Sequence, residues 1–388
     1  MKRSAALVSA GCTLLLALYF PGAVESHNPV TTTVLFNREV SGILQRKCAQ
    51  CHAPDALAMP LTTYDETRPW AVAMKEQILG RRMPPWPAER GYGEFSNDGG
   101  LTNREREFLV SWIDGGVPQG DGEAPPYVDH SGHWMLGAPD AVLPASAGVT
   151  VEAGDAIGVR RLFIDNVLTQ DRWVRGFDYK PDRRVVRAAF LTVEATREYL
   201  GGWTPMRSGG DLPAGVAIRV PARSRIVVDA LYQPPTNVLS GTPPGPVTDK
   251  PQLGLYFSEP PKRTLKTITL ASMPVTGATA GAARRLAASA VLPGDTALVE
   301  MRPELPEGGR SIEVKAKFPD GSSEVLLWIS RFDPQWQSSF LVRRPTPVPK
   351  GTAVQAIAYV DEADARPSQF RLTLTGYETP PPATPRLR

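Results

Sequence analysis

The chain has 388 residues, a length typical of two or three domains, and 42% of its residues are hydrophobic, which is enough for packed cores. Its formal net charge of +3 is too small to indicate binding to nucleic acid or to an acidic membrane surface. The 39 prolines and 34 glycines predict many short segments joined by turns.

The first residues have the composition of an export signal. Met1-Lys2-Arg3 is basic, and the apolar stretch 5–20 is short for a membrane span. Small residues follow, so we predict a signal peptide over 1–26, cleaved after Ala23 or Ser26. An uncleaved anchor is the alternative. We therefore expect an exported protein on the periplasmic or extracellular side of a bacterial membrane, with a membrane-associated complex as an open possibility.

Residues 30–120 have the apolar spacing of helices, and apolar side chains recur at helical intervals over 36–44, 70–78 and 108–113. Thr102 and Glu105 have the spacing of a capping box, which predicts the start of the last helix. The pattern indicates a small helical domain.

Cys48-Ala49-Gln50-Cys51-His52 is the attachment signature of a c-type haem. Two thiols separated by two residues reach the two vinyl groups of one porphyrin, and the next histidine provides the proximal iron ligand. A zinc site needs four ligands, and a dithiol centre is expected beside a βαβ pattern, so both are weaker interpretations. A chance match that binds nothing is the remaining alternative. We predict one covalent haem c held by Cys48, Cys51 and His52.

The sixth iron ligand is expected to be Met83, because the two prolines after it end the preceding helix and fix its loop. Met59 and Met74 are rival ligands, and an open or histidine-filled position is a further alternative. Arg81 and Arg82 have the charge to pair with haem propionates, although exposed arginines at a helix end are common.

The chain changes character after residue 120. A polar linker is predicted over 121–135, and short runs rich in β-branched and aromatic residues follow, bounded by proline or glycine. We predict two antiparallel β-sandwich domains, at 136–260 and 261–376, and a disordered proline-rich tail at 377–388. Pro319-Asp320-Gly321 and Pro349-Lys350-Gly351 are hairpin turn signals.

The helical part resembles the small class I cytochrome c domains at the head of multidomain bacterial proteins. Besides the haem motif, the resemblance rests on Arg-Pro-Trp at 68–70, Met-Pro-Pro-Trp at 83–86 and Trp-Ile-Asp-Gly-Gly at 112–116. It implies that His52 and Met83 are the axial pair. The expected fold class is an N-terminal all-α cytochrome c domain followed by two all-β domains.

The β region resembles the paired sandwiches of copper type II, ascorbate-dependent monooxygenases, such as the peptidylglycine hydroxylating enzymes. The residues that carry the resemblance lie at 254–257, 318–321, 324–327, 332–337 and 349–352. Other residues stand where that family has copper ligands: Arg187, Ala188, Leu231, the stretch 301–305 and Tyr359.

No histidine occurs after residue 133, so the chain cannot build two imidazole-rich copper sites there, and we expect no copper. His130 and His133 are either half of a metal site or, more simply, solvated linker residues.

From these features we expect an exported cytochrome that transfers electrons to unidentified redox partners, with the copper-free sandwiches as a docking or binding module. The alternatives are a haem-dependent oxidoreductase with its substrate in the sandwich region, and a redox-sensing structural or binding protein. Residues 134–388 show no acid, base or nucleophile constellation, which favours a carrier over an enzyme.

Overall fold

The computed structural model describes residues 31–207, 209–236, 244–274, 283–361 and 369–379. The predicted signal peptide and residues 380–388 of the predicted tail lie outside these ranges. In the described ranges, no helix has both the length and the apolar character needed to cross a membrane.

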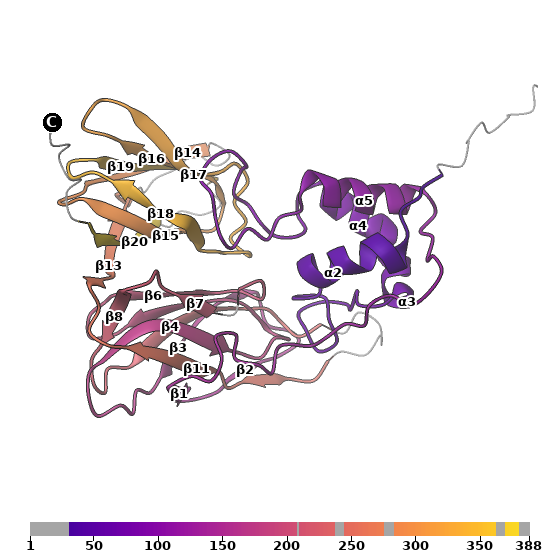
Figure 1. Ribbon diagram of the computed structural model, residues 1–388, viewed down its shortest axis with the longest axis horizontal. Helices are drawn as coiled ribbons and strands as arrows, with labels where there is room; N and C mark the ends of the chain where they lie inside the picture. Colours follow the sequence, from indigo (N-terminus) through magenta and orange to yellow (C-terminus); the bar gives the residue numbers. More distant parts are fainter. Residues whose placement is uncertain (1–30, 208, 237–243, 275–282, 362–368, 380–388) are drawn as a thin grey trace, which may run out of the picture.

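A helical segment comes first and lies beside two stacked β-sandwiches (Figure 1). A π-helical turn, η1, and a 3₁₀ turn, η2, accompany its α-helices. The elements are η1 (Phe36–Val40), α2 (Ser41–Lys47), α3 (Tyr64–Thr67), η2 (Arg68–Trp70), α4 (Ala71–Leu79) and α5 (Asn103–Asp114).

The predicted capping box at the start of α5 is confirmed. The backbone N–H of Glu105 donates to Oγ1 of Thr102 at 3.1 Å, and the Glu105 carboxylate accepts from the Thr102 N–H at 2.9 Å. These bonds satisfy N–H groups that have no partner inside the helix. The helix then packs Leu109 and Trp112, both fully buried, against Phe36.

The first sandwich consists of two main antiparallel sheets and a small ribbon. One sheet has the order β1-β11-β4-β8-β12, with β7 also on β4, the other has the order β3-β9-β5-β6, and β10 pairs with β2. The β12–β8 pair is parallel. The strands are β1 (Ala141–Pro144), β2 (Val149–Val151), β3 (Gly158–Ile164), β4 (Arg172–Lys180), β5 (Val186–Val193), β6 (Tyr199–Trp203), β7 (Gly209–Asp211), β8 (Val216–Val220), β9 (Ile226–Tyr232), β10 (Val247–Asp249), β11 (Gln252–Ser258) and β12 (Arg263–Thr264).

The second sandwich packs the sheet β13-β20-β15-β18 against the sheet β14-β19-β16-β17, and all its strand pairs are antiparallel. The last strand includes Tyr377 and Glu378, which the sequence assigned to the tail. The strands are β13 (Lys266–Ala271), β14 (Ala283–Val291), β15 (Thr296–Glu304), β16 (Gly309–Lys317), β17 (Ser323–Ile329), β18 (Phe340–Val348), β19 (Ala353–Asp361) and β20 (Arg371–Glu378).

Both predicted hairpin turns are confirmed in this second sandwich. Gly321 joins β16 to β17 with φ 88°, and Gly351 joins β18 to β19 with φ 84°. This left-handed conformation is one that glycine adopts without steric cost.

The segment 84–98 leaves the helices and packs on the second sandwich (Figure 1). Ala88 forms a β-bridge with Ile329 of β17, and Phe95 forms one with Val342 of β18. We call this segment the arm. Two of its three aromatic side chains, Trp86 and Phe95, join the core of the second sandwich.

The predicted fold class, with an N-terminal all-α cytochrome domain, is therefore wrong. The α-helices of this part have only 7, 4, 9 and 12 residues, and the arm belongs to a β-sandwich core. The physical reason is the proline- and glycine-rich composition of 84–98, which cannot continue a helix and carries aromatic residues that need a larger core.

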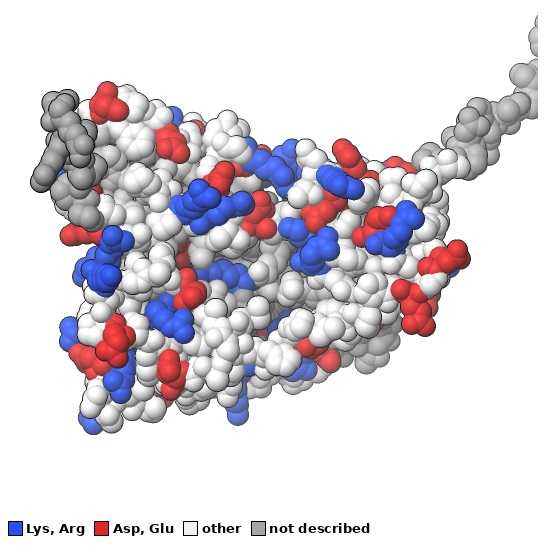
Figure 2. All heavy atoms as spheres, viewed as in Figure 1, with Lys and Arg blue, Asp and Glu red and all other residues white. Residues whose placement is uncertain are grey.

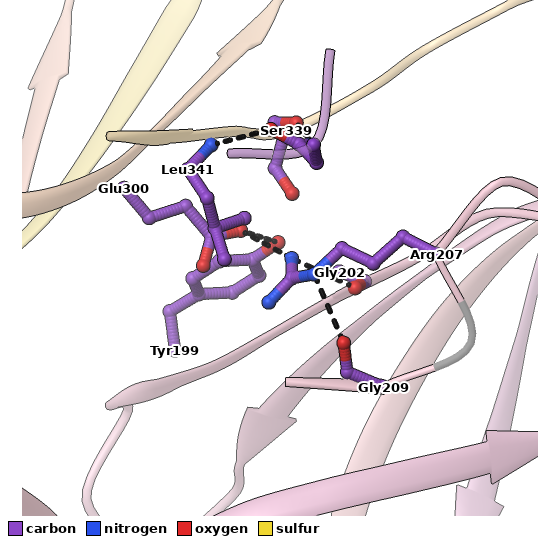
Figure 3. Close-up of polar contacts among 8 residues, drawn as sticks. Tyr199, Gly202, Arg207, Gly209, Glu300, Ser339 and Leu341 are labelled. Carbon is purple, nitrogen blue, oxygen red and sulfur yellow. Dashed lines mark hydrogen bonds and ion pairs between the residues drawn. The ribbon is translucent and has the colours of Figure 1, made fainter. Parts of the chain in front are cut away.

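The two sandwiches are joined by a buried polar contact (Figure 3). Glu300 of β15 accepts hydrogen bonds from Oη of Tyr199 at 3.4 Å and from Nη1 of Arg207 at 3.5 Å. Arg207 also donates to the carbonyl oxygens of Gly202 at 3.1 Å and Gly209 at 3.0 Å. The bonds from Tyr199 and Arg207 to Glu300 link the first sandwich to the second.

Candidate functional site

A cavity of about 280 Å³ lies where the helical segment meets both sandwiches. Its helical wall contains every residue predicted to bind the cofactor, and most of the lining is apolar. Its chemistry-bearing lining residues are Lys47, Cys48, Cys51, His52, Met59, Met74 and Met83 from the helical side, and Arg187, Met206, Gln233, Thr236 and Trp336 from the sandwiches.

Cys48 ends helix α2, and the chain then makes a tight turn. The backbone N–H groups of Cys51 and His52 both donate to the carbonyl oxygen of Cys48, at 3.0 and 2.9 Å. Neither cysteine forms a disulfide, and burial raises the pKa of both thiols to about 12. Thiols of this kind are neutral at physiological pH, which does not favour the reactive thiolate of a dithiol redox centre.

The imidazole of His52 has a fixed orientation. Its Nδ1 lies 2.9 Å from the carbonyl oxygen of Met59, and because a carbonyl only accepts, Nδ1 carries the proton. Burial lowers the pKa of His52, an effect that the bond to Met59 partly opposes, so the ring is neutral at physiological pH. Nε2 therefore keeps its lone pair, as a metal-binding histidine requires.

Four methionines line the cavity, which gives the site several soft donors. Met83 follows the end of α4, Met74 lies within that helix and is buried, and Met59 precedes Pro60 in the loop after His52. Met206 comes from the first sandwich and was missed by sequence reasoning. It carried no local signal, because it becomes a neighbour of the haem motif only through tertiary packing.

The sandwich side of the cavity is attached to the loop after His52. Nε2 of Gln233 donates to the carbonyl oxygen of Leu57 at 2.7 Å, and Oγ1 of Thr236 donates to the same oxygen at 3.1 Å. The buried Gln233 also accepts from Nε of Arg187 at 2.6 Å. The first sandwich is thus tied to the same loop that orients the histidine.

The other candidate residues lie elsewhere. Arg81 pairs with Glu89 at 3.3 Å and Arg82 donates to the side chain of Gln77 at 2.7 Å, and neither arginine lines the cavity. His130 and His133 are exposed, with ring centroids 6.1 Å apart.

Of the positions compared with copper ligands, Ala188 and Leu231 are partners across β5 and β9 in a small buried apolar cluster. Arg187, also such a position, lines the cavity described above.

No protein-family model and no curated protein matches the chain. Among solved structures, the major capsid protein P2 from bacteriophage PM2 matches 63% of this chain and 98% of its own, at 7% identity and a TM-score of 0.29. The STIV MCP matches 62% of this chain and 95% of its own, at 9% identity and a TM-score of 0.25. A chain of the PBCV-1 virus capsid matches 61% of this chain and 93% of its own, at 7% identity and a TM-score of 0.24. Likenesses this distant carry no argument about what the chain does.

The expected resemblance to cytochrome c domains and copper monooxygenases is wrong. The described part of the chain is mostly strands with short helices, and the solved structures named above are capsid proteins.

The expectation of an electron-transfer cytochrome is contradicted as well. Within the described ranges, no group of three or more His, Cys, Asp or Glu side chains is placed to hold a metal ion.

Proposed function

We propose that this chain is a haem-binding protein, and that Cys48, Cys51 and His52 attach one haem covalently in the cavity between the helical segment and the sandwiches. The proposal concerns the attachment of the cofactor and assigns no electron-transfer role. The observation that carries it is the orientation of His52, whose Nδ1 is engaged by Met59 while the residue lines an apolar cavity together with both thiols.

The chemistry of the donor set fits this group. The porphyrin itself supplies most of the iron ligands, so the protein needs to provide only His52 and one further axial donor. Thioether bonds to the vinyl groups consume two thiols, and the chain places two unpaired thiols on one turn. The apolar lining matches the face of a macrocycle, which buries a large hydrophobic area.

The test is to produce the full chain in cells that carry a c-type haem maturation system. Denaturing electrophoresis followed by haem staining should show a coloured band at the mass of the protein. Acidified butanone should extract no haem from it. Cys48→Ala with Cys51→Ala should lose the covalent haem, and Cys12→Ala should keep it. A wild-type protein without covalent haem would overturn the proposal.

The sixth ligand is a separate part of the proposal, and we assign it to Met83. Ferric protein should show the long-wavelength sulfur-to-iron charge-transfer band, and Met83→Leu should abolish it. Leucine substitutions of Met59, Met74 and Met206 are matched controls, because leucine conserves volume and removes only the sulfur. Loss of the band in one of these controls, with the band kept in Met83→Leu, would assign the sixth ligand to that other methionine.

The exported location of the protein and its binding to a protein partner remain predictions. Covalent c-type haem is assembled outside the bacterial cytoplasm, which supports an exported location for a protein with this attachment site. The predicted signal peptide lies outside the described residues, so sequencing the N-terminus of the mature protein is the direct test. Acidic and basic side chains are interspersed over the face shown in Figure 2, which gives no reason to expect a partner of one strong charge.

A further inference from the structure

Arg187 brings a positive charge from the first sandwich to the wall of the apolar cavity. Three contacts fix its position. Nε donates to Oε1 of Gln233 at 2.6 Å, Nη1 donates to the carbonyl oxygen of Gln335 at 3.0 Å, and the guanidinium carbon lies 4.4 Å from the ring centroid of Trp336. An arginine held by both sandwiches in this way has lost most of its side-chain freedom.

In the part of the chain that the structure describes, this charge has no acidic partner of its own. Among the described residues, no carboxylate lies within ion-pair distance of Arg187, and Asp333 acts on it only at longer range. Arg183, four residues earlier, is instead paired with Asp129 at 2.6 Å. Lys47, the other cation of the cavity wall, has Glu105 nearby.

Holding a half-buried guanidinium without a carboxylate is costly, because burial removes water that stabilises the charge. The same burial lowers the pKa of Arg187. Proteins usually compensate such a group with an anion, and the guanidinium fork is suited to a carboxylate. The fixed orientation of Arg187 therefore points to an acidic group on whatever occupies the cavity.

We propose that Arg187 is the counter-charge for a carboxylate of the ligand bound in this cavity. The inference rests on the proposed function, under which the ligand is haem and the carboxylate is one of its two propionates. The first sandwich then takes part directly in holding the cofactor. Gln233 extends this role, since it joins Arg187 to the Leu57 carbonyl in the loop that orients His52.

The test compares Arg187→Gln, Arg187→Lys and a control, Arg219→Gln, in the full chain with attached haem. Arg219 is an exposed arginine of β8 that pairs with Asp171 on the surface. Arg187→Gln should keep the covalent haem and shift its midpoint reduction potential to a lower value, because a positive charge near the iron favours the reduced state. Arg187→Lys should restore part of the shift, and Arg219→Gln should leave the potential unchanged.

Infrared difference spectra of the reduced and oxidised protein, with ¹³C in the haem propionate carboxyl groups, test whether a propionate is the carboxylate that Arg187 contacts. The carboxylate bands should move in Arg187→Gln and stay in place in Arg219→Gln. Unchanged bands in Arg187→Gln overturn the inference, even if the potential has moved. A wild-type protein that carries no covalent haem instead overturns the proposed function, so the two failures are distinguishable.

Discussion

The carbonyl oxygen of Met59 lies 2.9 Å from Nδ1 of His52, seven residues earlier in the chain, and this contact determines which ring nitrogen carries the proton. The same loop contains Leu57, whose carbonyl accepts from Gln233 and Thr236 of the first sandwich. The orientation of the imidazole therefore depends on a loop that the first sandwich holds through hydrogen bonds to Leu57.

The tautomer of His52 can be measured in protein produced without haem. Long-range ¹H–¹⁵N spectra should show His52 with its proton on Nδ1, because only that nitrogen faces an obligate acceptor. His130 and His133, which are exposed, serve as internal references for solvent-exposed imidazoles. A proton on Nε2 of His52 would contradict the geometry of the site.

Gln233→Leu should destabilise the protein by about 1–3 kcal/mol, because Nε of Arg187 loses its acceptor and the Leu57 carbonyl keeps only the bond from Thr236. Thr236→Val removes one bond to the same carbonyl from an exposed side chain, and should cost less than about 0.5 kcal/mol. Urea unfolding measures both. Equal losses for the two variants would mean that Gln233 does not hold the loop.

The arm should contribute to stability through its aromatic contacts. Phe95 and Phe340 have ring centroids 5.4 Å apart at 63°, and both are buried. Phe340→Ala should cost about 3–5 kcal/mol. A double-mutant cycle with Phe95→Ala should give a coupling of about 0.5–1.5 kcal/mol.

A cycle of Phe95 with Phe257, which lies in β11 of the first sandwich, is the control and should be additive. Additivity of Phe95 with Phe340 as well would mean that the arm does not pack on the second sandwich in solution.

The ion pair between Arg207 and Glu300 should matter more than pairs on the surface, because both side chains are about nine-tenths buried. Glu300→Gln leaves Arg207 without a counter-charge and should cost about 3–5 kcal/mol. Asp171→Asn breaks an exposed pair with Arg219 and should cost much less than Glu300→Gln, because solvent screens the pair. Thermal unfolding of the variants checks the ranking, and a reversed order would contradict the buried contact of Figure 3.

The contribution of one buried carboxyl group, that of Asp249, to the stability of the protein should fall as the pH rises. Burial raises the pKa of Asp249 from 3.8 to about 6, although Oη of Tyr232 and the N–H of Asp182 both donate to it at 2.7 Å. The folded protein then binds more protons than the unfolded chain between pH 3.8 and pH 6, so the contribution of Asp249 is full below pH 3.8 and is lost as the pH rises through 6. The loss is roughly 3 kcal/mol.

Asp249→Asn removes this titration, so the stability of the wild type relative to the variant should fall between pH 4 and pH 7. Asp171 is a control of opposite sign, since hydrogen bonds lower its pKa and stabilise the ionised form. Urea unfolding at both pH values measures the differences. A wild type that gains stability relative to Asp249→Asn as the pH rises would contradict the assigned direction.

Local features of the fold were predictable from the sequence, because their causes lie within a few residues. The Thr102 capping box and the turns at Gly321 and Gly351 are of this kind. The packing of the arm was not predictable. Ala88 and Phe95 pair with strands more than two hundred residues later, and no pattern within residues 84–98 indicates those strands.

The site shows the same division. Cys48, Cys51, His52 and Met83 were predicted as site residues from spacing and from the prolines after Met83, and the structure brings them to one cavity. The sandwich wall was not found. Arg187 was interpreted only as a residue in place of a copper ligand, whereas it lies beside the motif because of how the sandwich docks. Sequence spacing cannot give that docking geometry.

The cavity wall extends along the chain from Lys47 to Trp336, and this has a consequence for how the protein matures. A chain that emerges from its N-terminus presents Cys48 and Cys51 long before Arg187, Gln233 and Trp336 exist to cover them. Under the proposed haem attachment, the thiols stay open to an attachment enzyme until both sandwiches have folded and docked. Premature docking should then lower the fraction of molecules that carry haem.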